Sequence, residues 1–359
     1  MPSVHVLRDG SAEREACERS LATAGVRLPL PHRAGWPLAR RGVESRCVAL
    51  RGTDGHWAAA FAVDAVDSRA LPGFRLLRVE RFGEALPQAL WSTAVDALAA
   101  VGRRDRRVLR LSVEVFSRDS DRREQLGELL AGAGFERAAA CRFWGTTLAL
   151  DLQPGEDDIL KSFSQTARQS IRAVAKLPVQ VRPVSDCRLA ARLEELSRES
   201  FARTGAHFAG LWDWAGVIEL AQQMPDATRL VGLFRTDRAG PDALLGFAWG
   251  WWNGDSVSYF AGASARPADL RVAIGHPLLW DLIVWAKRAG ATWFDLGGVT
   301  GGTAGSDDPM GGISAFKRMF SKVTTDVAED WVLEPRWLPA RVATLVSSGV
   351  AWLSRLRRK

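Results

Sequence analysis

The sequence predicts an α/β fold in which one pattern of strands and helices occurs twice, and three observations carry this prediction. The chain has 359 residues, more than the roughly 250 to 300 that a single hydrophobic core usually organises, so two domains are expected. The order of strands and helices expected in the first half recurs in the second half. In both halves a proline opens the long helix (Pro87, Pro277) and a glycine closes it (Gly102, Gly290).

The first half starts with antiparallel strands and then alternates helices with strands. Residues 46–66 alternate apolar and polar side chains around Asp54-Gly55, which predicts two strands joined by a turn, and residues 74–83 predict a third strand. The spacing of apolar residues then predicts a helix, a strand, a helix and a strand, over 86–102, 107–116, 123–135 and 141–152.

The second half repeats this order with a hairpin, a strand, a helix and a strand, over 227–254, 256–264, 276–290 and 292–298. Antiparallel strands followed by a strand–helix–strand unit predict a mixed sheet with helices on its faces. We therefore expect a first domain over 1–155, a second over 156–340, and a basic amphipathic tail over 341–359.

Composition and cysteine usage limit the function classes. With 47% hydrophobic and 25% charged residues the chain is an ordinary globular protein, and no apolar run reaches the roughly 18 residues that span a bilayer. The first residues lack the apolar core of a secretory signal, so a cytoplasmic location is expected. The four cysteines lie far apart and form no C-x-x-C pair, which predicts reduced thiols and no metal site.

The charge of the chain indicates an anionic partner. The formal net charge is +7 and the isoelectric point is about 9.7, which suits a nucleic acid, a phosphorylated cofactor or an acidic membrane surface. The alternative is the arginine-rich composition that a GC-rich genome produces.

A basic stripe over 156–182 is the first candidate binding surface. At about 100° per residue, one helical stripe is apolar and another carries four cations; the apolar positions are Leu160, Phe163, Ala167, Ile171 and Val174, and the cations are Lys161, Arg168, Arg172 and Lys176. Four cations on one face predict contacts with phosphate groups, and a solvated charged face is the alternative.

Two further stretches place polar residues beside helix ends. Arg203 and Thr204 precede Gly205 at an expected helix break, and His207 is either an acid or base or a packed structural residue. Before the helix that Pro277 opens, Arg271, Gly275 and His276 could hold an anion at the helix N-terminus.

The stretch FDLGG, 294–298, ends a predicted strand with an acid and two glycines. Asp295 faces away from its apolar neighbours, and Gly297 and Gly298 allow backbone N–H groups to approach a ligand. The segment that follows, up to Gly312, is rich in Gly, Ser and Asp. It is longer than a simple connection needs, which predicts a lid or a loop ordered by ligand. Lys317 then projects beside this loop, where it either neutralises a developing negative charge or is an ordinary surface lysine.

Taken together, these motifs resemble a known family. The resemblance rests on Arg168, Ile171, Arg172 and Ala173, then on Arg203–Phe208, Tyr259–Ser264, FDLGG at 294–298, and the segment Gly312–Phe320 with its Phe316-Lys317 pair. In this order they resemble the Fem-type transferases, tandem GNAT-fold enzymes that add amino acids to peptidoglycan precursors and, in relatives, to other amines. The match covers roughly residues 156–335, and the family's glycine after the last phenylalanine is replaced by Ser321.

The resemblance implies two tandem GNAT-like domains, the first degenerate for donor binding, and amide formation by acyl transfer. The donor it implies is aminoacyl-tRNA, with no bound cofactor, and the acceptor is an amine of a peptidoglycan precursor or a peptide-like small molecule. An acyl-CoA-dependent N-acyltransferase of the wider GNAT superfamily is the alternative. A tandem lobe without activity that binds RNA or a membrane is a third reading, which the intact FDLGG and Phe316-Lys317 motifs disfavour.

The resulting candidate site has three groups of residues. An aminoacyl ester or thioester is already activated, so positioning and oxyanion stabilisation are sufficient and no side-chain nucleophile is needed. Lys317 is expected near the transfer centre, and Asp295 and His276 are the candidate bases. The expected substrate-binding residues are Arg168, Arg172, Arg203, Thr204, His207, Tyr259 and Phe316, and the expected donor-binding residues are Arg271, Gly275, Gly297 and Gly298.

The tail over 341–359 is amphipathic and ends in cations. Its apolar residues are Val342, Leu345, Val346, Trp352, Leu353 and Leu356. It either docks on the protein's own surface or lies on an anionic membrane, which would suit a lipid-linked acceptor.

Overall fold

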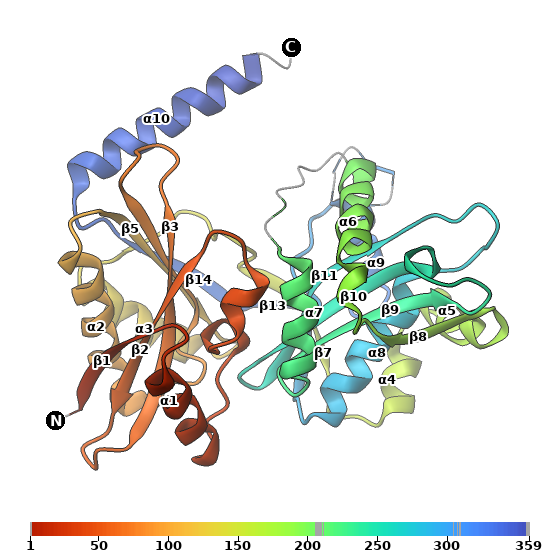
Figure 1. The fold of residues 1–359 in the computed structure, drawn as a ribbon, viewed down its shortest axis with the longest axis horizontal. Coiled ribbons are helices and arrows are strands. Elements are labelled where there is room, and N and C mark those ends of the chain that lie inside the picture. Colours follow the sequence, from red (N-terminus) through yellow and green to blue (C-terminus); the bar gives the residue numbers. More distant parts are fainter. Residues whose placement is uncertain are drawn as a thin grey trace. The chain divides into compact units, whose positions relative to one another are not determined.

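The computed structural model describes residues 2–204, 210, 212–303, 305–306, 308 and 310–356, with only the backbone of Thr204 and of 347–356. The chain divides into two compact units, each built on a seven-stranded sheet (Figure 1). Unit 1 consists of Met1–Pro37, Gly42–Arg142 and Val327–Lys359, and unit 2 consists of Leu38–Arg41 and Phe143–Asp326.

Unit 1 contains the strands and helices expected in the first half, except for the strand over 141–152. Its strands lie in the order β1 (Ser3–Arg8), β2 (Glu44–Arg51), β3 (Trp57–Asp67), β4 (Arg75–Phe82), β5 (Val108–Phe116), β14 (Ala328–Leu333) and β6 (Glu136–Arg137). Only β4 and β5 are parallel. The helices of this unit are α1 (Ala12–Thr23), α2 (Trp91–Arg104), α3 (Ser120–Gly132) and α10 (Trp337–Leu356).

Unit 2 repeats this arrangement. Its strands lie in the order β13 (Thr324–Asp326), β7 (Thr146–Asp151), β12 (Trp293–Asp295), β11 (Ser256–Ser264), β10 (Leu244–Asn253), β9 (Thr228–Arg235) and β8 (Val179–Pro183). Only β11 and β12 are parallel. The helices are α4 (Glu156–Ser162), α5 (Gln165–Ala173), α6 (Ala190–Thr204), α7 (Trp214–Gln223), α8 (Gly275–Arg288) and α9 (Gly311–Lys317).

The two sheets have one topology, and each takes one strand from the other half of the sequence. A long helix connects the parallel strands in both units, α2 between β4 and β5 and α8 between β11 and β12. On the far side of that pair, unit 1 uses β14 from the end of the chain and unit 2 uses β7 from its middle. The strand predicted over 141–152 therefore exists as β7, but it belongs to the second sheet. The sequence pattern predicts the strand but not the strands with which it pairs.

The basic stripe does not lie on one continuous helix, so that prediction is wrong. Helix α4 ends at Ser162, the chain turns at Phe163-Ser164, and α5 starts at Gln165. The Ser164 side chain caps α5 by accepting a hydrogen bond from the Ala167 N–H at 3.2 Å. Phe163 is 2% exposed and packs edge-on against Trp280 and Phe320, so burial of this ring favours the break over a straight helix.

The exchange of strands predicts that a C-terminal residue stabilises the N-terminal core. Leu333 on β14 is 5% exposed and packs in the core cluster of unit 1. Leu333→Ala should lower the free energy of unfolding by about 3 kcal/mol, because it removes buried methyl groups and leaves a cavity. Urea denaturation measures the loss, and hydrogen exchange should show it on β4 and β5 but not on β9 and β10. Val323→Ala, at a side chain that is 64% exposed, is the control, and an equal effect of both variants would contradict the prediction.

Candidate active site

Asp295, the last residue of β12, is a buried carboxylate that joins three segments of unit 2. It is 4% exposed. One oxygen accepts a hydrogen bond from the Gly297 N–H at 2.7 Å and another from the Thr147 hydroxyl on β7, and the second oxygen accepts one from the Ser258 hydroxyl on β11 at 2.8 Å. With these three donors on its two oxygens, Asp295 fixes the ends of the strands. The geometry favours this anchoring role over that of a base.

The parallel strands of unit 2 separate immediately beyond this anchor. Strand β12 pairs with β11 only through Ser256–Ser258, whereas β11 continues to Ser264. In unit 1 the corresponding pair extends from Arg75 to Phe82, with register shifts after Arg75 and after Val79. Within the described part of the chain, no strand pairs with β11 on the β12 side after Ser258. Backbone groups there could bind an extended ligand as an added strand would.

Lys317 brings a buried ammonium group to this point. Its side chain is 7% exposed, and Nζ donates a hydrogen bond to the Gly298 carbonyl at 2.9 Å. Burial lowers the pKa of Lys317 to about 8, and the charge of Asp295 opposes this shift. The amine is therefore mostly protonated at neutral pH. The prediction of a cation beside the FDLGG motif agrees with this geometry, and the alternative of an ordinary surface lysine does not.

Gly297 and Gly298 are required by the close approach of two side chains. Gly297 has φ +80°, and a β-carbon on it would lie 2.9 Å from Lys317 Nζ. A β-carbon on Gly298 would overlap the ring of Trp144, at 1.9 Å from Cγ. The backbone at these two residues therefore lies between the ammonium group and an indole ring.

A second cluster seats helix α9 on the start of α8. The Phe316 ring packs closely on Gly275, since a β-carbon there would lie 3.1 Å from the ring. The Phe316 and His276 rings pack edge-on, with 5.1 Å between their centroids. His276 Nε2 is 3.4 Å from Met319 Sδ, and its Nδ1 is buried with no hydrogen-bond partner in the described chain. Burial lowers the pKa of His276. This packing favours a neutral structural imidazole over an accessible base.

The glycine-rich segment is tied to α9 by side-chain contacts. The Thr300 N–H donates to Ser314 Oγ at 3.0 Å, and the Thr300 hydroxyl donates to Asp308. Arg318 donates to the carbonyl of Gly302 at 3.0 Å and to that of Thr300. Hydrogen bonds within the protein thus hold those residues of the segment that the structure describes.

Two of the four cations of the basic stripe are engaged by neighbouring residues of α4 and of the turn that follows it. Arg168 donates to the carbonyls of Lys161 and Phe163 at the end of α4, and Lys161 pairs with Asp158 at 2.8 Å. Arg172 and Lys176 are exposed and have no hydrogen-bond or ion-pair partner among the described residues. The Ser164 N–H donates to the Met319 carbonyl at 2.8 Å, so the start of α5 lies against the turn that follows Lys317.

The remaining predicted residues lie along β11 and before α8. The Arg203 guanidinium donates to the Ser264 carbonyl at the end of β11, and Thr204 is the last residue of α6. Burial raises the pKa of Tyr259, on β11, to about 12. Arg271 is exposed in the segment before α8. His207 lies outside the described residues.

The structure thus brings together part of the predicted set and adds side chains that the sequence did not indicate. Lys317, Asp295, Gly297 and Gly298 form one group, and Phe316, Gly275 and His276 form the adjacent one. The added side chains are Thr147, Ser258, Trp144 and Ser314. Thr147 and Trp144 escaped notice because their strand was expected in the other domain, and a serine on a strand has no distinctive pattern.

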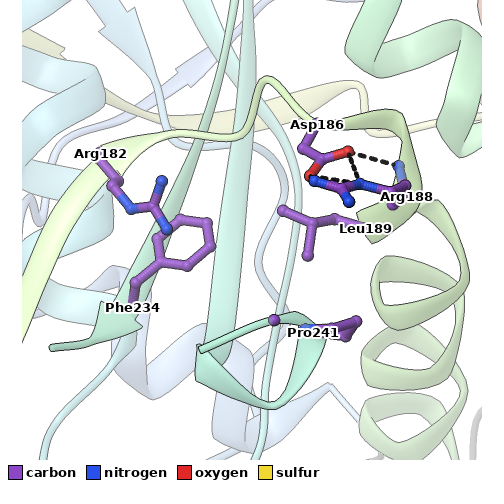
Figure 2. Close-up of a pocket in the computed structure, with 7 residues that line it drawn as sticks. Arg182, Asp186, Arg188, Leu189, Phe234 and Pro241 are labelled. Carbon is purple, nitrogen blue, oxygen red and sulfur yellow. Dashed lines mark hydrogen bonds and ion pairs between the residues drawn. The ribbon is translucent and has the colours of Figure 1, made fainter. Parts of the chain in front are cut away.

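A separate pocket lies at the other edge of the same sheet (Figure 2). It has a volume of about 400 Å³ and is lined by residues of β8, β9 and the loops around them. The Arg182 guanidinium lies 3.7 Å from the Phe234 ring centroid, and Arg188 pairs with Asp186 at 2.7 Å. None of the predicted site residues lines it, so this pocket is distinct from the Lys317 group.

Comparison with known proteins agrees with this arrangement. Residues 161–318 match the family described as the acetyltransferase (GNAT) domain. FemX has a similar solved structure, with a TM-score of 0.62, 16% identity, and coverage of 82% of this chain and 89% of FemX. No curated protein sequence matches the chain.

Two further solved structures have the same fold. L-PGS from Bacillus licheniformis has a TM-score of 0.56 and 14% identity, covering 95% of this chain and 97% of that protein. The C-terminal domain of a putative lysylphosphatidylglycerol synthetase from Agrobacterium fabrum has a TM-score of 0.51 and 14% identity, covering 94% and 97%.

The family match assigns residues 161–318 to a domain of the GNAT acetyltransferase type, and the solved structures show that the chain shares the fold of FemX and L-PGS. Within that class the chain has the Fem-like tandem fold, since unit 1 repeats the sheet order of the matched unit. The predicted resemblance to the Fem-type tandem GNAT fold is confirmed, and so is the mixed α/β fold.

The fit of the two glycines around Lys317 gives a direct test. Gly297→Ala should reduce turnover at least about 30-fold, because a β-carbon at this left-handed position displaces the ammonium group. Gly312→Ala is the matched control, since a β-carbon there meets nothing within 4 Å. Steady-state kinetics measure both variants, and equal turnover would show that the position of the ammonium group does not matter.

Proposed function

We propose that the protein forms amide bonds by transferring an aminoacyl group from aminoacyl-tRNA to an amine of a peptidoglycan precursor or a peptide-like small molecule. The observation that carries the proposal is the buried Lys317 ammonium group at the point where β11 and β12 separate. An ammonium group at such a place can stabilise the negative charge that develops when an ester carbonyl is attacked.

The proposed reaction requires little more than alignment and charge stabilisation. The acceptor amine attacks the ester carbonyl of the donor, a carbon–nitrogen bond forms, and the carbonyl oxygen becomes an oxyanion. Lys317 has three N–H donors and the Gly298 carbonyl takes one, so the others can face that oxygen. The carbon–oxygen bond then breaks, the ribose hydroxyl of the tRNA leaves, and the proton lost by the amine goes to the leaving oxygen or to solvent.

Two features support tRNA over CoA as the donor. Arg172 and Lys176 are exposed cations on the helical segment that follows the α4–α5 turn, and they can contact backbone phosphates. At the start of α8, where a pyrophosphate could bind, Pro277 has no N–H group and Phe316 packs on Gly275. The alternative, an acyl-CoA-dependent N-acyltransferase, would use the same Lys317 group.

The choice of donor predicts a location and gives a test. A tRNA donor implies a cytoplasmic enzyme. Incubation with a pool of charged tRNA and a mixture of amines should give labelled amides by mass spectrometry, and ribonuclease should abolish them. Turnover with acyl-CoA that ribonuclease does not affect would replace the proposal with the alternative.

Lys317→Met should separate catalysis from folding. Turnover should fall at least about 100-fold, because methionine fills the space of the lysine without its charge. The melting temperature at pH 7 should be unchanged or higher, since the buried ammonium group is unfavourable to the fold. Lys322→Met removes an exposed lysine five positions along the chain and is the control. A parallel loss of stability and turnover would make Lys317 structural.

The pH dependence of activity and of stability should have opposite signs. Activity that needs the ammonium form should decline as the pH rises through about 8. Between about 8 and the ordinary value of 10.5 the unfolded chain binds more protons at Lys317 than the folded chain does. The contribution of this residue to stability therefore increases with pH over the same range, and both trends should be absent in Lys317→Met.

A further inference from the structure

Helix α10 of unit 1 turns its small residues inward and its large apolar residues outward. Ala340 and Ala343 are buried, at 3% and 9% exposure, and α10 contacts β5. At about 100° per residue, one half of the helix circumference carries the exposed apolar side chains: Trp337 (62%), Leu338 (59%), Val342 (43%), Leu345 (72%) and Val346 (41%). Docking on the protein's own surface therefore uses only the alanine side, and the larger apolar face stays uncovered.

The sequence continues this pattern beyond the described side chains. Trp352, Leu353 and Leu356 follow Leu345 at intervals of 7, 8 and 11 residues, which are helical intervals. No acidic or basic residue occurs between Arg341 and Arg355. Figure 1 shows α10 as a long blue helix whose C-terminal end points away from the strands of unit 1.

The net charge of the chain is concentrated in this segment. The chain has 48 basic and 41 acidic residues, and residues 335–359 contain six of the basic ones and none of the acidic ones. The other 334 residues therefore have 42 basic against 41 acidic side chains and are close to neutral. The six cations are Arg336, Arg341, Arg355, Arg357, Arg358 and Lys359.

We propose that α10 lies along an anionic lipid surface, with its large apolar face in the bilayer interface. An uncovered apolar face flanked by cations and free of acids complements a surface of acyl chains and negatively charged headgroups. Trp337 suits the interface, and the Arg341 guanidinium lies 5.7 Å from its ring. None of the described helices is long and apolar enough to cross a membrane.

Other binding partners would match either the cations or the apolar face of α10, but not both. A nucleic acid would neutralise the cations but leave the apolar side chains in water. A second copy of α10 would cover the apolar side chains but bring two highly cationic segments together. The lipid surface is the one partner that matches both.

Vesicle cosedimentation of the full chain tests the proposal. The protein should sediment with vesicles of phosphatidylcholine and phosphatidylglycerol at least about tenfold more than with phosphatidylcholine alone, and added NaCl should weaken binding. Val342→Gln/Val346→Gln should reduce the partition coefficient about tenfold, because both side chains would leave the interface. Amide formation with a soluble acceptor should be unchanged in this variant.

A matched variant controls for the loss of exposed valines. Val4→Gln/Val6→Gln removes two valines of unit 1 that are 43% and 49% exposed, and it should bind vesicles as the unaltered chain does. The proposal is overturned if the tail variant binds equally well, or if the vesicles do not bind the unaltered chain. It is equally overturned if the tail variant loses tRNA binding or self-association but keeps its vesicle binding.

Discussion

The hydrogen bond from the Lys317 ammonium group to the Gly298 carbonyl is the interaction on which the candidate site depends. It places a buried charge against the backbone, at a position that a β-carbon on Gly297 would crowd to 2.9 Å. Asp295 fixes the preceding turn by accepting a hydrogen bond from the Gly297 N–H. Phe316, the neighbour of Lys317 on α9, seats the helix on Gly275. Asp295, the turn at Gly297–Gly298 and helix α9 therefore pack together around the Lys317 ammonium group.

The duplicated topology explains why only one unit offers this site. In unit 1 the parallel strands pair from Arg75 to Phe82, with two register shifts, so most backbone groups on the inner edges bind each other. In unit 2 the pairing stops at Ser258, and Asp295 holds the strands at the point of separation. The exchange of β7 and β14 adds a further dependence, since Thr147 on the exchanged β7 completes the hydrogen bonds of Asp295. The same strand exchange that closes the sheet of unit 2 thus also supports its site.

Local periodicity was sufficient to predict most strands and helices, because burial of one face imposes a period of two or of about 3.6 residues. The motif at 294–298 and Lys317 can be predicted as site residues because two glycines after a strand, followed by a single lysine, are typical of a binding site. Pairing across more than a hundred residues leaves no periodic signal, so the place of β7 and the roles of Thr147 and Trp144 were missed. The break at Phe163 was missed because its ring has the correct spacing for a continuous helix, and only its packing against Trp280 and Phe320 decides otherwise.

The distribution of charge changes what the composition implies. A net charge of +7 suggests a protein that attracts polyanions as a whole, yet without residues 335–359 the chain has 42 basic and 41 acidic side chains. Exposed charges are screened over about 8 to 10 Å at physiological salt, so net charge by itself is no measure of binding at Lys317. Any attraction of a phosphate-bearing donor must therefore come from local residues such as Arg172 and Lys176. The net charge supports an anionic partner for residues 335–359, and the geometry around Lys317 supports the proposed acyl transfer.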